Sequence, residues 1–252
     1  MKIFFVCSSN TKSKSAFRFM VKQYGQANVE EAECIVVLSG DGMVLKAFHE
    51  HFDRKIPVYG MNRGKTGFLT NKYSKENLTE KIQQALEVKF HPLRIIIEKK
   101  NGETFSDIAI NEVYLLRETH QSAKIAIKVD GVLRMQELIC DGLITASQIG
   151  STAYNYSAHG PIIPVGFQLM TLTPISPFRP RNWRGAVLPS ETILDFEVLD
   201  GARRPVCAVA DYIEFRQAVN VKVFEDRTVT LSLLLDKNNS LESKTLNEQF
   251  TT

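Results

Sequence analysis

The sequence predicts an N-terminal α/β domain with a doubly wound, Rossmann-like parallel sheet, followed by an all-β, sandwich-like domain. In residues 1–92, short apolar runs alternate with segments of helical periodicity, which is typical of a parallel sheet covered by helices. In residues 93–236, short β-rich runs follow one another, separated by turn signals such as Asn-Gly and Asp-Gly. The polar residues 237–252 are expected to form a loosely held tail.

The first domain is expected to alternate strands and helices. Its strands are short apolar runs of the kind buried on both faces, and its helices carry apolar residues on one face. In chain order we expect a strand at 2–7, a helix at 11–25, a strand at 35–38, a helix after residue 42, a strand at 56–59 broken by Gly60, and a helix at 74–89. Ligands of such sheets bind at the carboxyl ends of the strands, where Gly40-Asp41-Gly42 falls.

The second domain is expected to consist of short strands, some paired as hairpins. The expected strands are 93–99, 105–116, 124–129, 132–138, 142–147, 168–173, 193–199, 206–215 and 219–224, with 228–235 closing the series. Val221, Val223 and the run 231–235 are interpreted as exposed apolar clusters. Because sheet edges must be covered, these clusters favour a contact between subunits.

Composition indicates a soluble globular protein. The 252 residues are 44% hydrophobic and 23% charged. The net charge of +3, without a block of like charges, argues against a nucleic-acid partner, and no apolar run approaches membrane-spanning length. The N-terminal apolar run is too short for a signal peptide. Three of the four cysteines lie in apolar runs, which favours reduced, buried thiols. We therefore expect a cytoplasmic protein that binds no membrane.

The turn Gly40-Asp41-Gly42 admits two interpretations. Asp41 could cap the following helix, since Asp is a favoured N-cap residue. Alternatively, the two glycines could let a ligand approach the backbone, leaving N–H groups free to meet a phosphate at the helix N-terminus. One glycine would suffice for a turn, so the pair favours the second interpretation. The turn is neither a P-loop nor a G-x-G-x-x-G fingerprint.

Two further segments are candidates for ligand binding. The glycine-rich loop 59–71 carries Arg63 and Lys65, which could hold phosphates or simply be solvated. Asn111-Glu112 interrupts an apolar strand, and polar residues there cost stability unless they are paired or face a ligand. The amide and carboxylate could bond sugar hydroxyls or a base edge.

The segment 140–161 has the most unusual composition. Asp141 begins an apolar strand, and residues 150–157 form a helix-like stretch rich in hydroxyls that ends at Gly160-Pro161. Such hydroxyls could serve as helix caps, but their number favours the lining of a polar pocket. The sequence shows no metal cage and no G-x-S-x-G elbow.

Taken in order, these motifs resemble those of the bacterial NAD kinase family, which phosphorylates the 2′-hydroxyl of the adenosine ribose of NAD to make NADP. Ser39-Gly40-Asp41-Gly42 resembles the family's G-G-D-G signature, and Asn111-Glu112 resembles its N-E pair. Asp141-Gly142 and the later run Gly150-Ser151-Thr152-Ala153-Tyr154 with Ser157 resemble its second D-G and its G-S-T-A-Y-x-x-S run. The resemblance covers roughly residues 1–230 and includes the segments 59–71 and 172–181.

The resemblance implies that the first motif is catalytic. Asp41 would be the general base that takes the proton from the ribose 2′-hydroxyl as it attacks the γ-phosphorus of ATP. Gly40 and Gly42 would allow close packing of the nucleotide, and Lys46 would touch phosphate. Mg²⁺, or another divalent cation, would bridge the ATP phosphates, so no metal site built from protein ligands alone is implied.

The resemblance also implies how substrate is bound. Asn111 and Glu112 would contact the dinucleotide, and Asp141 would hold its nicotinamide-side ribose, from a neighbouring subunit. The adenosine site would be lined by the hydroxyl-rich segment, namely Thr152, Ala153, Tyr154, Asn155, Tyr156 and Ser157. NAD kinases assemble through the second domain, which implies a homo-oligomer, a tetramer built from dimers.

The chain departs from the family pattern at three positions. Ser39 replaces the first glycine of the signature, Cys140 replaces the glycine before the second aspartate, and His159 replaces one glycine after the hydroxyl-rich run. None of these removes a chemical group named above. Two rivals are a lipid kinase, which needs an apolar cavity where 150–157 is polar, and a dinucleotide sensor, which needs no carboxylate at Asp41.

Overall fold

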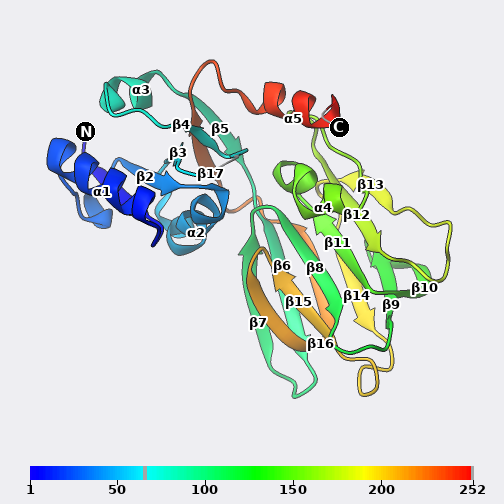
Figure 1. Ribbon diagram of the computed structural model, residues 1–252. Helices are drawn as coiled ribbons and strands as arrows, with labels where there is room; N and C mark the ends of the chain where they lie inside the picture. Colours follow the sequence, from blue (N-terminus) through cyan, green and yellow to red (C-terminus); the bar gives the residue numbers. More distant parts are fainter. Residues whose placement is uncertain (65–66, 251–252) are drawn as a thin grey trace. The chain divides into compact units, whose positions relative to one another are not determined.

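The structure, a computed structural model, describes residues 1–64 and 67–250. The chain forms two compact units (Figure 1). The first unit combines Met1–His91 with the C-terminal segment from Thr228 onward, and the second unit is Pro92–Arg227. The predicted fold class, a parallel α/β unit followed by an antiparallel β unit, is confirmed.

The first unit is built on a six-stranded sheet in the order β1-β2-β3-β17-β5, with β4 paired to β3. Its strands are β1 (Ile3–Cys7), β2 (Cys34–Ser39), β3 (Val58–Asn62), β4 (Thr70–Lys72), β5 (Leu86–Phe90) and β17 (Leu231–Leu235). All pairs are parallel except β17 with β5. The carboxyl ends of the parallel strands therefore share one edge, called here the binding edge.

Helices cover both faces of this sheet, as a doubly wound fold requires. The helices are α1 (Thr11–Tyr24), α2 (Asp41–His51) and α3 (Leu78–Gln84), with 3-10 turns η1 (Val29–Glu31) and η2 (Phe52–Arg54). Residues of α1 and α3 share a buried cluster with Tyr59. The neighbouring Gly60 lies against Val44 of α2, since a Cβ built there would be 3.0 Å from its Cγ2. Successive strand residues point to opposite faces, so α2 covers the other face.

The C-terminal segment differs from its prediction. The run 228–235 was expected to close the β domain, but β17 lies in the first sheet, between β3 and β5. The residues after it were expected to be a loose tail, but they contain helix α5 (Leu241–Phe250), in which Leu241 and Thr245 are buried. The apolar composition of β17 explains its place, because central parallel strands are buried on both faces.

Two other predicted elements of the first unit end elsewhere. The helix predicted at 74–89 stops at Gln84, and strand β5 follows. Residues 86–90 form a strand because apolar and charged residues alternate there. Leu86, Val88 and Phe90 are spaced by two residues, with charged residues between them. The strand predicted to break at Gly60 continues to Asn62, because the missing side chain admits the close neighbours Thr70 and Val44.

The second unit is an eleven-stranded antiparallel sheet in the order β10-β9-β14-β16-β15-β8-β11-β12-β13, with β6 paired to β16 and β7. Its strands are β6 (Leu93–Lys99), β7 (Thr104–Ala109), β8 (Glu112–Arg117), β9 (Ala123–Val129), β10 (Val132–Cys140), β11 (Gly142–Ala146), β12 (Leu169–Ile175), β13 (Ala186–Pro189), β14 (Leu194–Val198), β15 (Val206–Ala210) and β16 (Ile213–Glu225). The predicted run 105–116 is divided into β7 and β8 at Asn111.

One long strand joins the parts of this sheet around a single core. The first half of β16 pairs with β15, and its second half pairs with β6 on one side and β14 on the other. Side chains from these strands form one buried cluster. Val221 and Val223 belong to it, and Leu233 is buried in the first unit, so the prediction that these apolar residues are exposed is wrong.

The prediction of reduced and mostly buried thiols is confirmed. All four cysteines are free, and Cys34, Cys140 and Cys207 are buried.

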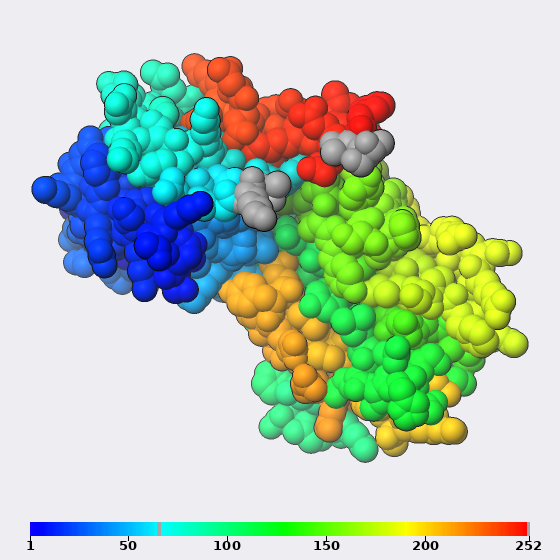
Figure 2. All heavy atoms as spheres, viewed as in Figure 1, coloured from blue at the N-terminus to red at the C-terminus, as the bar shows by residue number. Residues whose placement is uncertain are grey.

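Figure 2 shows the segment around helix α4 (Tyr154–Ser157) lying at the surface of its unit, where Tyr156 and Ser157 are exposed. Among the residues that the structure describes, no helix is long and apolar enough to span a membrane.

Candidate active site

Asp41 is not the cap of helix α2. The N-cap residue is Gly40, and Asp41 is the first residue of the helix. Its carboxylate instead accepts two backbone hydrogen bonds from a distant segment, one from Phe68 N–H to Oδ2 (2.6 Å) and one from Leu69 N–H to Oδ1 (2.9 Å). The capping interpretation of this residue is therefore wrong. The side chain connects the end of β2 to the segment that precedes β4.

The surroundings of Asp41 make its carboxylate more basic than that of an exposed aspartate. Burial raises its pKa, and the N–H groups of Phe68 and Leu69 and the charge of Lys244 oppose this without cancelling it. A carboxylate with a raised pKa has a greater tendency to accept a proton in a reaction. The site therefore combines a fixed orientation with increased proton affinity.

The two glycines beside Asp41 are not required by the packing of the protein. A Cβ atom built on Gly40 or Gly42 would meet no heavy atom within 4 Å, and the φ of Gly40 (−97°) suits any residue. By contrast, a Cβ on Gly67 would lie 1.9 Å from the Thr70 hydroxyl oxygen. The space on both sides of Asp41 is therefore open, which fits the interpretation that a ligand approaches this turn.

Of the basic residues predicted near Asp41, two contact other side chains and the third lies outside the residues that the structure describes. Arg63 lies over the ring of Tyr73, with 4.1 Å from its Cζ to the ring centroid. Lys46 forms an ion pair with Glu50 at 3.6 Å, and both side chains are half exposed. Lys65 lies outside the residues that the structure describes. Surface pairs of this kind are weak, so Lys46 is free to exchange partners.

In the second unit, Asn111-Glu112 forms a tight turn that is held by Asp211. The Asp211 carboxylate accepts hydrogen bonds from the N–H groups of Ile110 (2.7 Å), Asn111 (2.9 Å) and Glu112 (3.2 Å). Asp211 occupies the turn between β15 and β16, with φ of 53°. The sequence analysis missed this residue, and its only signal is an aspartate directly after a buried apolar strand.

Glu112 is buried and poorly partnered. Glu112 is only 6% exposed, and its Oε2 has no hydrogen-bond partner among the residues that the structure describes. Burial, together with the charge of Asp211, raises the pKa of Glu112 to about 8, against the opposing effect of the Tyr154 N–H. Such a strongly shifted, partly unpartnered carboxyl group is characteristic of a functional site.

The hydroxyl-rich segment lies directly against the Asn111-Glu112 turn. It consists of η3 (Ile149–Thr152) and α4. A Cβ on Gly150 would lie 2.0 Å from the Asn111 carbonyl oxygen, so this glycine allows the two backbones to meet. The Ser147 hydroxyl donates to the Ile110 carbonyl (2.7 Å) and accepts from Gly150 N–H (3.1 Å). The structure thus brings the second and third sequence motifs together.

Within this segment the predicted residues differ in accessibility. Thr152, Ala153 and Tyr154 are partly exposed, and Tyr154 packs edge-to-face on Tyr114 at 5.2 Å. Asn155 is 0% exposed. Its Nδ2 donates to the carbonyls of Ser151 and Pro161, and its Oδ1 accepts from the hydroxyls of Thr171 and Thr173. Asn155 therefore fixes the helix and has no free polar atom for a ligand.

Asp141 lies away from the other motifs of its own unit. It precedes β11, and Gly142 pairs with Leu116 of β8, whereas Ala146 pairs with Glu112. Asp141 and Glu112 therefore lie at opposite ends of this strand pair, about 15 Å apart at the rise of a β-strand. The Asp141 carboxylate accepts a hydrogen bond from Arg117 Nε at 2.6 Å. One subunit alone does not bring Asp141 to the Asn111-Glu112 turn.

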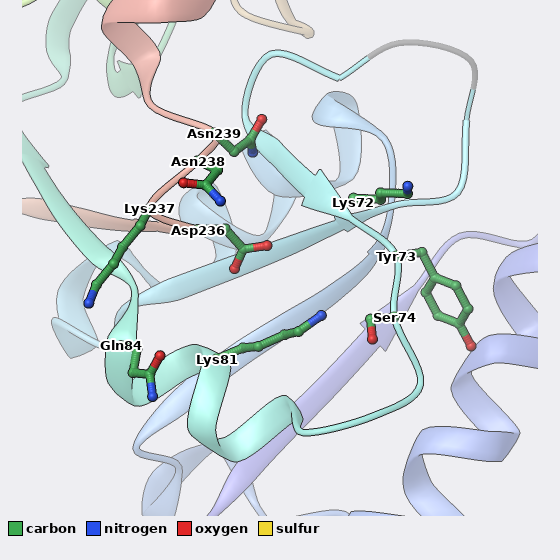
Figure 3. A pocket seen from close by; sticks show the side chains of 9 residues that line it. All are labelled: Lys72, Tyr73, Ser74, Lys81, Gln84, Asp236, Lys237, Asn238 and Asn239. Atoms are coloured by element: carbon green, nitrogen blue, oxygen red, sulfur yellow. The ribbon is translucent and has the colours of Figure 1, made fainter.

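The first unit also contains a polar pocket of about 820 Å³ (Figure 3). It is lined by Lys72, Tyr73, Ser74, Lys81, Gln84, Asp236, Lys237, Asn238 and Asn239. None of these residues belongs to a predicted site motif. Among residues 1–64 and 67–250, no group of three or more His, Cys, Asp or Glu side chains could hold a metal ion.

Both units match one class of protein, the ATP-dependent kinases of NAD. The family model of the ATP-NAD kinase N-terminal domain matches residues 4–90, and that of the ATP-NAD kinase C-terminal domain matches residues 110–228. An NAD kinase from Caulobacter vibrioides is 47% identical over 249 residues, which cover 99% of this chain and 96% of that protein. An NAD kinase from Rhizobium meliloti is 46% identical over 98% of this chain and 96% of its own length. The chain belongs to the NAD kinase family of enzymes.

Solved structures show the same fold at low sequence identity. An NAD kinase from Archaeoglobus fulgidus in complex with ATP has a TM-score of 0.78 and 23% identity, over 98% of each chain. A yeast NADH kinase complexed with NADH has a TM-score of 0.86 and 18% identity, over 100% of this chain and 88% of that one. The chain thus has a fold that these proteins share.

The buried Glu112 predicts a pH dependence of stability. Its pKa is higher in the folded chain, about 8, than the 4.5 of the free group, so folding takes up a proton between these values. This contribution to stability is present below about pH 4.5 and is lost as the pH rises through about 8. Denaturant unfolding at several pH values should show the loss in wild type but not in Glu112→Gln. Glu103→Gln, at an exposed position, should follow wild type, and parallel curves for all three would contradict the prediction.

Proposed function

We propose that the protein transfers the γ-phosphoryl group of ATP to the 2′-hydroxyl of the adenosine ribose of NAD, making NADP, with Asp41 as the general base. One observation carries the assignment of the base. The Asp41 carboxylate is held at the binding edge by two N–H groups, has a raised pKa, and has open space where its flanking glycines lack side chains. The family and its relatives support the choice of substrates.

In the proposed reaction, the 2′-oxygen attacks the γ-phosphorus while its proton passes to a carboxylate oxygen of Asp41. The bond between the γ-phosphorus and the bridging oxygen breaks, and ADP leaves with that electron pair. Asp41 then returns its proton to solvent. The N–H groups of Phe68 and Leu69 stabilise the ionised carboxylate before transfer and fix its direction. Mg²⁺, or another divalent cation, would enter with ATP and neutralise phosphate charge.

The motifs of the second unit would bind the dinucleotide. Asn111 and Glu112 would contact it from the turn that Asp211 holds. Protonated Glu112 could donate a hydrogen bond as well as accept one, which suits a ribose hydroxyl. The accessible members of the hydroxyl-rich segment would line the adenosine site, namely Thr152, Ala153, Tyr154, Tyr156 and Ser157, with Asn155 holding them in place. In the first unit, Lys46 would leave Glu50 to contact phosphate.

The location of Asp141 favours a homo-oligomer, a tetramer built from dimers. Within one subunit this residue lies at the far end of the strand pair from Glu112, so it would serve a neighbour's site. The terminal strand β10 exposes the apolar residues Val132 and Leu133, which a second copy could cover. Light scattering coupled to size exclusion should give a mass well above the 28.5 kDa chain. A fully active monomer at assay concentration would contradict this assembly.

The reaction itself can be tested by product identity. When the protein is mixed with NAD and Mg-ATP carrying a label in the γ-phosphate, label should appear in a product that an NADP-specific dehydrogenase reduces. NADH should be offered in parallel as acceptor, because it differs only in the nicotinamide. Absence of labelled product, from protein that is folded and binds NAD, would remove the proposal.

The role of the glycines predicts a separation of stability from binding. Gly42→Ala should leave the melting temperature unchanged or raise it, because no atom occupies the Cβ position and Ala is favoured over Gly in a helix by about 0.5–1 kcal/mol. The same change should raise the KM for a nucleotide substrate at least ~10-fold by obstructing its approach. Gly201→Ala, in a turn of the second unit where a Cβ would make only ordinary contacts, serves as a control for the kinetics. Wild-type kinetics for Gly42→Ala would contradict the proposed approach.

A further inference from the structure

Lys244 of helix α5 is bound to the same short backbone segment as Asp41. Its Nζ donates hydrogen bonds to the carbonyl oxygens of Phe68 (2.8 Å) and Thr70 (3.0 Å). Asp41 accepts hydrogen bonds from the N–H groups of Phe68 and Leu69. The segment 68–70 is therefore held through its N–H groups by an anion and through its carbonyl groups by a cation.

The C-terminal segment is itself fixed against this region. Asn239 Nδ2 donates to the carbonyl of Thr70 (3.1 Å) and to Oδ1 of Asn71 (3.0 Å). Asn71 Oδ1 also accepts from the Asp236 N–H at 2.8 Å. Figure 3 shows Asp236 and Asn239 on the connection between β17 and α5, beside the strand that carries Lys72. Lys244 thus extends from an anchored helix and is not a mobile surface side chain.

The charge of Lys244 is part of the electrostatic balance around Asp41. Burial lowers the pKa of Lys244 to about 8, and the negative charges of Asp41 and Asp236 oppose that effect. Asp236 in turn accepts a hydrogen bond from the Tyr59 hydroxyl at 2.6 Å. In the other direction, the Lys244 charge lowers the pKa of Asp41 against the larger effect of burial. The charged groups facing Lys244 are thus Asp41 of α2 and Asp236 after β17.

We propose that Lys244 is a positioning residue for Asp41, acting through the Phe68–Thr70 backbone that both side chains hold. This inference rests on the proposed function, because it gives Lys244 a role in turnover only if Asp41 is the base. The ammonium group fixes the carbonyl groups, the peptide planes then direct the N–H groups toward the carboxylate, and the carboxylate is held in one orientation. Small errors in the placement of a reacting group reduce rates strongly, by about 10²-fold for 1 Å.

The test compares three variants with the full chain as the background. Lys244→Gln removes the charge, Lys244→Arg keeps it, and Lys237→Gln removes an equal charge from an exposed position of the same C-terminal segment. Lys244→Gln should lower kcat about 10- to 100-fold with little change in the KM for NAD. Lys244→Arg should recover most of kcat, and Lys237→Gln should match wild type.

The pH dependence separates positioning from a merely structural role. Loss of the Lys244 charge raises the pKa of Asp41, so the acidic limb of the kcat/KM profile should move to higher pH in Lys244→Gln. Because Glu112 also has a pKa of about 8, the alkaline limb is compared in a Glu112→Gln background, where activity should fall above about pH 8 as Lys244 loses its proton. In that background Lys244→Arg should lack the fall, because its guanidinium stays charged. If Lys244→Gln fails to fold, the arginine profile decides, and a fall that persists in Lys244→Arg with Glu112→Gln overturns the proposal.

A double variant identifies the path of the effect. In an Asp41→Asn background, Lys244→Gln should reduce the residual rate by less than about twofold, because its effect passes through the missing carboxylate. A full additional loss in that background, or wild-type kcat and pH profile in Lys244→Gln, overturns the inference. If instead Asp41→Asn alone keeps wild-type kcat, the assignment of Asp41 as base fails first, and the two failures are distinguished.

Discussion

The pair of hydrogen bonds from Phe68 N–H and Leu69 N–H to the Asp41 carboxylate organises the binding edge of the first unit. These bonds provide partners for the N–H groups of Phe68 and Leu69 and help to fix the direction of the carboxylate. The same bonds limit how far burial can raise the pKa of the carboxylate. The hydrogen bonds orient the carboxylate and burial raises its pKa, which is what the proposed base requires. Phosphoryl transfer depends mainly on positioning and charge stabilisation by the protein.

The C-terminal part of the chain returns to the first sheet and contacts the same segment that Asp41 holds. Strand β17 pairs with both β3 and β5, so the sheet cannot be completed until the last part of the chain has been made. The segment after β17 then brings Lys244 to the carbonyl groups of Phe68 and Thr70. The second unit repeats the principle with Asp211, whose carboxylate fixes three N–H groups around Asn111. In both units, a partly buried carboxylate accepts hydrogen bonds from the backbone of the segment that the proposed ligand would meet.

The sequence predicted what depends on local periodicity and on motif order. The alternation of strands and helices up to β3 and the hairpins of the second domain follow from local patterns, whereas strand β4 lies partly in the segment predicted as a loop. The sequence did not predict the place of β17, because an apolar run does not specify which sheet it joins. Asp211 and Lys244 were missed for a related reason, since each acts on backbone groups about 100 or more residues away. When a side chain forms hydrogen bonds to peptide groups far away in the sequence, no fixed residue spacing reveals the contact.

The measurement that tests the account most directly is the single-turnover rate of phosphoryl transfer by Asp41→Asn, with NAD affinity measured on the same preparation. The amide keeps the size of the carboxylate and one acceptor for the Leu69 N–H, but it has no useful proton affinity. The account predicts a rate lower by about 10²–10⁴-fold, the range for loss of a general base, with NAD affinity within a few-fold of wild type. A rate near that of wild type, in a variant that binds NAD normally, would show that Asp41 only anchors the backbone and would contradict the account.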